Sequence, residues 1–179
     1  MKKRQLKQLC SLLIPCLLFS FQNVNAKDIK IPSSVPEWFP SETCMEMMDT
    51  LIDEFNLSEE GAASVLGNVC QESKFDQNAY SGYYFGICQW DPYQRWPLIV
   101  GWIEENGYSK DDAIAQLRAA FNNAEDYVYA ETLEYMKTVS SIEDGVHRWL
   151  VYYEGAVGQE ESQRITYAYY ALDLYNENK

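Results

Sequence analysis

The sequence is poor in the residues that usually bind metal ions. It has a single histidine, His147, among 179 residues, and no cysteine pair with Cys-x-x-Cys spacing. Structural zinc and iron–sulfur sites take their ligands from clusters of cysteine and histidine. The sequence therefore predicts neither a metal site nor a cofactor. Because His147 falls between the apolar Val146 and Trp149, a structural or surface role is expected for it.

Basic residues are also scarce. The chain has 14 Lys and Arg against 27 Asp and Glu, which gives a formal net charge of −13. Proteins bind nucleic acids largely by placing positive charge against phosphates, so this balance excludes that class of partner. It also predicts repulsion from anionic surfaces.

The N-terminus has the pattern of a secretory signal peptide. Four basic residues lie within positions 1–7, an apolar run follows at 9–21, and Val24-Asn25-Ala26 supplies small residues for cleavage. We expect cleavage after Ala26 and a secreted or extracytoplasmic product, in the cell wall or periplasm, without stable membrane insertion. Cleavage would leave 10 basic and 27 acidic residues, a net charge of −17. The alternative is an uncleaved anchor, although the run is short for a membrane-spanning helix.

The remaining chain has the length of one compact domain. Residues 27–40 contain Pro32, Pro36 and Pro40 and indicate a linker or arm. We therefore expect a signal peptide at 1–26, an arm at 27–40 and a folded domain at 41–179.

Helical periodicity dominates the predicted domain. One apolar face comprises Cys44, Met48, Leu51, Ile52 and Phe55, and a second comprises Ala62, Val65, Leu66 and Val69. Ser58 between them has the properties of a helix N-cap, so the two helices are expected to form an antiparallel hairpin. Further helices are predicted at 93–106, from Ser109, from Ser141, and at 159–176.

The segment 77–92 interrupts this pattern. It reads QNAYSGYYFGICQWDP and combines two glycines with several aromatic residues, which favours a loop with a short strand or hairpin. The expected fold class is therefore α+β, mostly helical, with a small β insert next to the second helix.

Glu72 lies near the end of that second helix. It follows Val65, Asn68 and Val69 by seven, four and three residues, so it shares their buried face. Burial among apolar neighbours would favour the protonated carboxyl, which suits a general acid. The simpler alternative is a helix-end glutamate that faces water.

The motifs around Glu72 resemble those of the phage tail lysozyme type within the lysozyme superfamily. The matching residues are Gly67-Asn68, Glu72-Ser73, Gly86-Ile87-Cys88-Gln89-Trp90 and Tyr153-Glu154. The resemblance extends from about Met45 to Tyr175. It implies a lysozyme-like fold and a glycosidase that cleaves peptidoglycan between MurNAc and GlcNAc.

The resemblance also implies roles for individual residues. Glu72 would be the catalytic acid and Tyr153 would hold it in position through a hydrogen bond. The expected substrate-binding residues are Ser73, Gln89, Trp90, Asp91 and Glu154, with Trp90 as a stacking surface for a sugar ring.

A second catalytic carboxylate is not fixed by the sequence. Asp76, Asp91 and Glu154 are the candidates. With such a carboxylate opposite Glu72 the enzyme would be a muramidase. Without one, the 6-hydroxyl of the sugar would attack instead, as in a lytic transglycosylase.

Three cysteines remain after the predicted cleavage. Cys44 and Cys70 lie thirteen residues on either side of residue 57, where the helical hairpin is expected to turn. This symmetry predicts a Cys44–Cys70 disulfide. A Cys70–Cys88 pair and buried free thiols are the alternatives.

Two other functions are compatible with the sequence. The chain could be a catalytically inactive glycan-binding or structural module that keeps a lysozyme fold. It could also be a lytic factor within a secretion or conjugation apparatus, although no sequence feature indicates a docking partner. Peptidoglycan glycan strands are the expected partner in each case.

Overall fold

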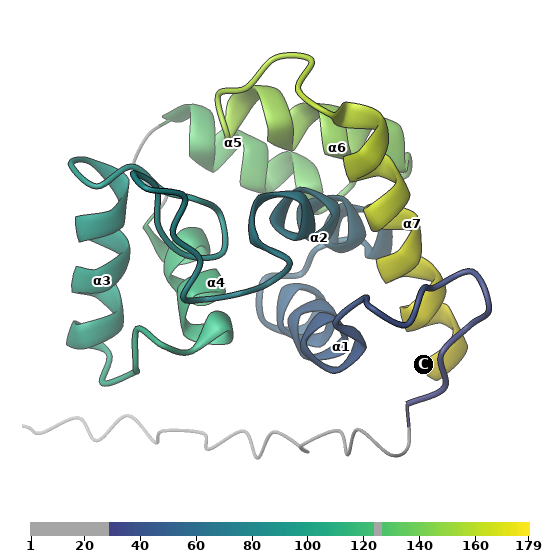
Figure 1. Ribbon diagram of the computed structural model, residues 1–179. Helices are drawn as coiled ribbons and strands as arrows, with labels where there is room; N and C mark the ends of the chain where they lie inside the picture. Colours follow the sequence, from purple (N-terminus) through teal and green to yellow (C-terminus); the bar gives the residue numbers. More distant parts are fainter. Residues whose placement is uncertain (1–28, 124–126) are drawn as a thin grey trace, which may run out of the picture.

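The computed structural model of the protein describes residues 29–123 and 127–179 (Figure 1). The predicted signal peptide therefore lies outside the described residues. The helices are α1 (Ser41–Asp49), η2 (Thr50–Glu54, a π-helical continuation of α1), α2 (Glu59–Ser73), α3 (Arg95–Glu105), α4 (Ala113–Asn122), α5 (Tyr127–Met136), α6 (Ile142–Tyr152) and α7 (Glu161–Asn178). None of the helices in these two ranges is long and apolar enough to cross a bilayer.

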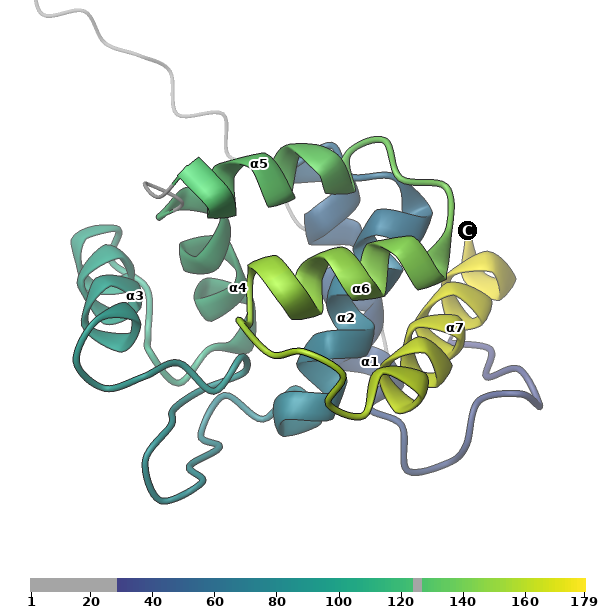
Figure 2. The same cartoon turned by 90° about the horizontal axis from the view of Figure 1, so that it is seen from above.

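Helix α2 lies in the middle of the domain, with α1 on one side, α6 on the other and α7 alongside (Figures 1 and 2). Every residue from Gly61 to Cys70 is buried. Gly67 allows the close approach of α7, since a Cβ atom there would lie 2.4 Å from the backbone oxygen of Arg164. The helix that ends beside Glu72 is therefore held on several sides.

Two of the predicted helix caps are confirmed. Ser58 Oγ accepts a hydrogen bond from the backbone N–H of Gly61 at the start of α2, and Ser141 Oγ accepts one from Asp144 at the start of α6. The predicted start of α4 at Ser109 is wrong. Asp112 caps this helix, because its carboxylate accepts hydrogen bonds from the N–H groups of Ile114 and Ala115, which lack helical partners.

An irregular insert, residues 74–94, connects α2 to α3. The predicted short strands are not confirmed: Phe85 forms isolated antiparallel bridges with Tyr80 and Trp90, and the described residues contain no longer strand. Positive φ angles at Gly86 (71°) and Gln89 (48°) turn the chain too sharply for a strand to continue. The insert is therefore a compact loop within a mostly helical domain.

Buried Gln116 of α4 holds this insert in place. Its Oε1 accepts the N–H of Ile87 at 3.0 Å, and its Nε2 donates to the backbone oxygens of Gln77 (2.9 Å) and Lys110 (2.7 Å). The amide therefore uses both ends of its side chain to fix the insert against α4.

The arm before α1 packs on the domain. Val35 and Phe39 are buried, and Lys30 and Ser34 form hydrogen bonds with Asn178 and Asp173 of α7. Helix α5 packs on α6 and was not predicted from the sequence. The chain segment before residue 41 thus contributes to the core.

Candidate functional site

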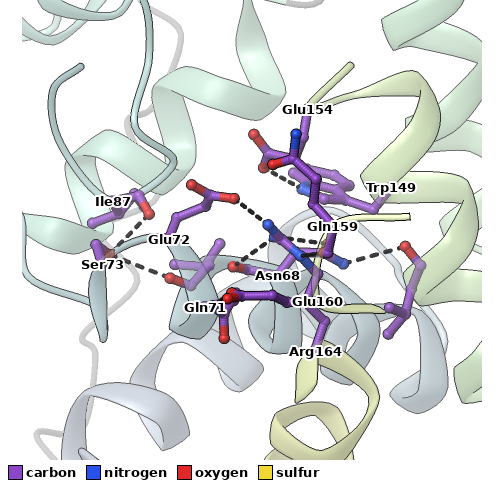
Figure 3. Close-up of polar contacts among 12 residues, drawn as sticks. Asn68, Gln71, Glu72, Ser73, Ile87, Trp149, Glu154, Gln159, Glu160 and Arg164 are labelled. Atoms are coloured by element: carbon purple, nitrogen blue, oxygen red, sulfur yellow. Dashed lines mark hydrogen bonds and ion pairs between the residues drawn. The ribbon is translucent and has the colours of Figure 1, made fainter. Parts of the chain in front are cut away.

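Glu72 lies near the C-terminal end of α2 and its side chain is 21% exposed. Apolar neighbours were expected around the Glu72 carboxylate, and this expectation is wrong. Nη2 of Arg164, on α7, donates to Glu72 Oε1 at 2.6 Å (Figure 3). An arginine that is 92 residues away in the sequence therefore fixes the direction of this carboxylate.

Arg164 is itself almost fully buried, with 4% of its surface exposed. Its other donors contact Asn68 Oδ1 at 3.2 Å and the backbone oxygen of Gln159 at 3.2 Å (Figure 3). A buried guanidinium is stable only where its hydrogen bonds are satisfied. Asn68, one of the residues that carry the family resemblance, helps to meet that requirement.

Glu154 follows the C-terminal end of α6 and supplies a second carboxylate. Trp149 Nε1 donates to Glu154 Oε1 at 2.8 Å (Figure 3). Burial and the nearby negative charge of Glu72 raise the pKa of Glu154 to about 7, although Arg95, Trp149 and Arg164 act in the opposite direction. Glu154 is therefore a carboxyl whose protonation responds to the charge on Glu72.

The other two candidates for a second carboxylate have local structural roles. Asp91 accepts backbone hydrogen bonds from Tyr93, Gln94 and Arg95 before α3, and these lower its pKa although burial acts in the opposite direction. Asp76 accepts the N–H of Asn78 at 2.8 Å in a turn. Of the three candidates, Glu154 is the one that interacts with Glu72.

Tyr153 does not form the predicted hydrogen bond with Glu72. Its ring is 1% exposed and stacks on Trp149 at 3.8 Å between centroids, while the Arg95 guanidinium lies 4.1 Å from it on the ring face. The Tyr153 hydroxyl and Trp90 Nε1 are both buried without a hydrogen-bond partner in the described part of the chain. The two side chains are close enough for Trp90 to affect the pKa of Tyr153, which burial raises.

The predicted substrate-binding residues of the insert are mostly engaged within the protein. Ser73 Oγ donates to the backbone oxygen of Ile87 at 2.9 Å, and Gln89 Nε2 donates to that of Gly86 at 3.0 Å. Trp90 is 2% exposed and stacks on Trp96, so the prediction of an open stacking surface at Trp90 is wrong. Because the insert folds back on itself, the ring faces the interior.

A cavity of about 220 Å³ opens between the insert, α3 and the end of α6. Its walls include Glu154 and the residues with unpaired polar atoms, Trp90 and Tyr153, but not Glu72. The remaining lining residues are Tyr84, Cys88, Gln89, Asp91, Gln94, Arg95, Tyr129, Tyr152 and Gly155. The polar side chains in this lining suit hydroxyl and amide groups of a ligand.

The predicted Cys44–Cys70 disulfide is absent. Cys44, Cys70 and Cys88 are free and buried. Burial raises the pKa of all three thiols, and the proximity of Cys70 adds to the effect at Cys44. Cys44 and Cys70 lie near each other, as the hairpin symmetry predicted, but both remain free thiols that pack as apolar core residues.

His147 is 58% exposed and pairs with Glu161 at 2.9 Å, in agreement with the predicted surface role. Within residues 29–123 and 127–179 no cluster of His, Cys, Asp and Glu is arranged to hold a metal ion.

Arg164, Arg95 and Trp149 are the site residues that sequence reasoning missed. Each takes its role from a contact across the fold, so spacing within one helix gave no indication of them.

The helical domain, with Glu154 in the wall of a polar cavity and Glu72 interacting with it, has the properties of a lysozyme-like glycosidase. A sequence model of the phage tail lysozyme family matches residues 42–175, and the chain belongs to that family. This membership makes it a lysozyme-like protein that acts on peptidoglycan. No curated protein matches the chain by sequence.

Proposed function

We propose that this protein is a secreted muramidase that cleaves the bond between MurNAc and GlcNAc. Glu72 is the general acid in this proposal and Glu154 is the second carboxylate. The observation that carries it is the pair of glutamates in unlike surroundings, one held by Arg164 and the other beside Trp149 with a pKa of about 7. Pairs of carboxyls with different environments are typical of glycosidases.

The two glutamates divide the chemistry as follows. Burial and the nearby charge of Glu72 raise the pKa of Glu154 to about 7, so Glu154 is partly ionised in the neutral range. In the proposed reaction Glu72, in its protonated form, gives its proton to the glycosidic oxygen as the bond to C1 breaks. Glu154, in its ionised form, accepts a proton from the water that adds to C1.

The cavity supports binding of the sugar. The cavity-lining side chains of Gln89, Gln94 and Tyr152 carry polar groups that suit hydroxyl or N-acetyl groups of a sugar. Arg95 is a cavity-lining cation in an acidic protein and suits the carboxyl group of MurNAc. Tyr153 supports the site through its stacking on Trp149, which in turn holds Glu154.

The test compares clearing of purified cell walls by the wild type, Glu72→Gln and Glu154→Gln. Each substitution keeps the shape of the side chain and removes its acid. Loss of an acid–base group lowers the rate by roughly 10²- to 10⁴-fold. The matched control is Glu105→Gln on the exposed part of α3, with wild-type activity expected.

Three results would contradict the proposal. Equal clearing by Glu72→Gln and wild type would move the acid elsewhere. Binding without clearing by the wild type would favour the inactive glycan-binding module. An anhydro-muramyl end on the released fragments, detected by mass analysis, would replace hydrolysis with a lytic transglycosylase reaction. Secretion is tested separately by whether the exported protein begins at Lys27.

A further inference from the structure

Exposed tyrosines gather on the insert next to the cavity. Tyr83 and Tyr84 are each 45% exposed, and Tyr93, just before α3, is 79% exposed. Figure 2 shows this insert projecting from the body of the domain beside α3. Side chains of this size are ordinarily buried in a core, so three neighbouring exposed rings require an explanation.

The three rings form a continuous row that begins at the cavity. Tyr84 is one of the cavity-lining residues. The Tyr83 ring lies 4.9 Å from that of Tyr84 and 6.0 Å from that of Tyr93, in edge-to-face arrangements. The row therefore leads from the cavity wall to the segment directly before α3.

We propose that Tyr83, Tyr84 and Tyr93 form a sugar-binding ledge, which holds the glycan strand beyond the residues that enter the cavity. The identity of the sugar rests on the proposed function. The protein would then bind a strand that occupies both the cavity and the ledge more tightly than a fragment that fills the cavity alone.

The chemistry of the ledge suits a polysaccharide. The axial C–H bonds of a pyranose ring form an apolar face that packs flat on an aromatic ring, and tyrosine adds a hydroxyl for hydrogen bonding. Such contacts need no positive charge, which suits a chain with a net charge of −13. A nucleic acid would also stack on tyrosines, but this charge excludes its phosphates.

The neighbouring exposed tyrosines contact groups outside the row, whereas the ring contacts of Tyr83, Tyr84 and Tyr93 are with one another. Tyr80 packs against Phe85 at 4.8 Å and donates its hydroxyl to the oxygen of Gly82 at 2.7 Å. Tyr152, on the opposite side of the cavity, has the Arg148 guanidinium 4.2 Å from its ring centroid. These two residues are accordingly left out of the proposed ledge.

The experiment measures binding of purified, peptide-free glycan strands in the Glu72→Gln background, with a single disaccharide and strands of about ten disaccharides as probes. Tyr83→Ala and Tyr93→Ala are each expected to weaken long-strand binding by about 2- to 10-fold, the usual range for one aromatic contact. The loss for the disaccharide should be smaller. Tyr83→Phe and Tyr93→Phe should retain most of the long-strand affinity, because stacking remains.

Tyr169→Ala is the matched control, since Tyr169 is 43% exposed on α7 and lies outside the cavity and the insert. Its long-strand affinity should equal that of the background protein. The ledge is refuted if Tyr93→Ala and Tyr169→Ala bind long strands equally, or if the losses are the same for both probe lengths. Binding is measured without cleavage, so an inactive enzyme would refute the proposed function and leave this test intact.

Discussion

At the scale of single residues, Arg164 connects α7 to the carboxylate of Glu72. Replacing Arg164 by Gln would leave Glu72 and Asn68 without a charged partner inside the protein. Breaking a buried pair from one side costs about 3–5 kcal/mol, and the partial exposure of Glu72 places the expected loss near the lower end. Chemical denaturation of Arg164→Gln measures this loss.

The control for Arg164→Gln is Lys137→Gln, because the ion pair between Lys137 and Glu134 lies on the surface. A change below about 1 kcal/mol is expected there. The double variant Glu72→Gln/Arg164→Gln should be less destabilised than the sum of the single variants, because each single change removes the same pair. Full additivity would mean that the two residues do not interact.

Glu154 predicts a specific dependence of stability on pH. Its folded pKa of about 7 exceeds the ordinary glutamate value of 4.5, so the folded state binds the proton more tightly than the unfolded state. This contribution is complete below about pH 4.5 and is lost as the pH rises through 7. Across that window it amounts to at most about 3 kcal/mol.

The Glu154→Gln variant cannot ionise at this position. Its stability at pH 8, relative to pH 5, should therefore fall less than that of the wild type. Thermal unfolding at both pH values measures the difference, with Glu105→Gln as the control that should follow the wild type. A wild-type slope in Glu154→Gln would assign the pH dependence to other groups.

For individual residues, the sequence predicted positions along one helix but not the partners that other helices supply. Helical spacing placed Glu72 at the partly exposed edge of a buried face, and the structure agrees. The same spacing gave no information about Arg164 or Trp149, because partner choice across helices depends on the packing of the whole domain. The apolar surrounding predicted for Glu72 and the hydrogen bond from Tyr153 were both wrong for that reason.

At the scale of elements, the helix caps show which features depend on neighbouring residues in the sequence and which depend on the rest of the fold. Ser58 and Ser141 were correctly predicted, because each is a small polar residue directly before an apolar helical pattern. Ser109 was an equally plausible choice by that rule, yet it lies in the preceding turn, and Asp112 caps α4. The insert was recognised from its glycines and aromatic residues, but its isolated bridges and the burial of Trp90 depend on contacts with α3 and α4.

Asp112→Ala should destabilise the protein by about 0.5–2 kcal/mol, because two N–H groups at the start of α4 lose their acceptor. Ser109→Ala is the matched comparison, with an expected change below about 0.5 kcal/mol. Both values come from urea denaturation. A larger loss in Ser109→Ala would restore Ser109 as the helix start.

At the scale of the whole molecule, the arm is an integral part of the packing. Phe39 is 3% exposed and its ring contacts Phe75 of the insert and Tyr170 of α7 in edge-to-face geometry. A linker would tolerate truncation of this side chain. Phe39→Ala is instead expected to cost about 3–5 kcal/mol, as for other buried rings.

Ile31→Ala provides the control within the same arm, since Ile31 is 55% exposed and should lose less than about 1 kcal/mol. Thermal or urea unfolding of both variants gives the comparison. Similar, small losses in the two variants would show that the arm is dispensable for folding.

The three buried thiols have a consequence for the chemistry of the folded chain. A thiol reacts only as an exposed thiolate, and Cys44, Cys70 and Cys88 are at most 2% exposed with raised pKa values. Oxidants and alkylating reagents therefore reach them only when part of the protein opens. Cys88 belongs to the insert whereas Cys44 and Cys70 belong to α1 and α2, so modification at Cys88 alone would signal a loosened insert around an intact helical core.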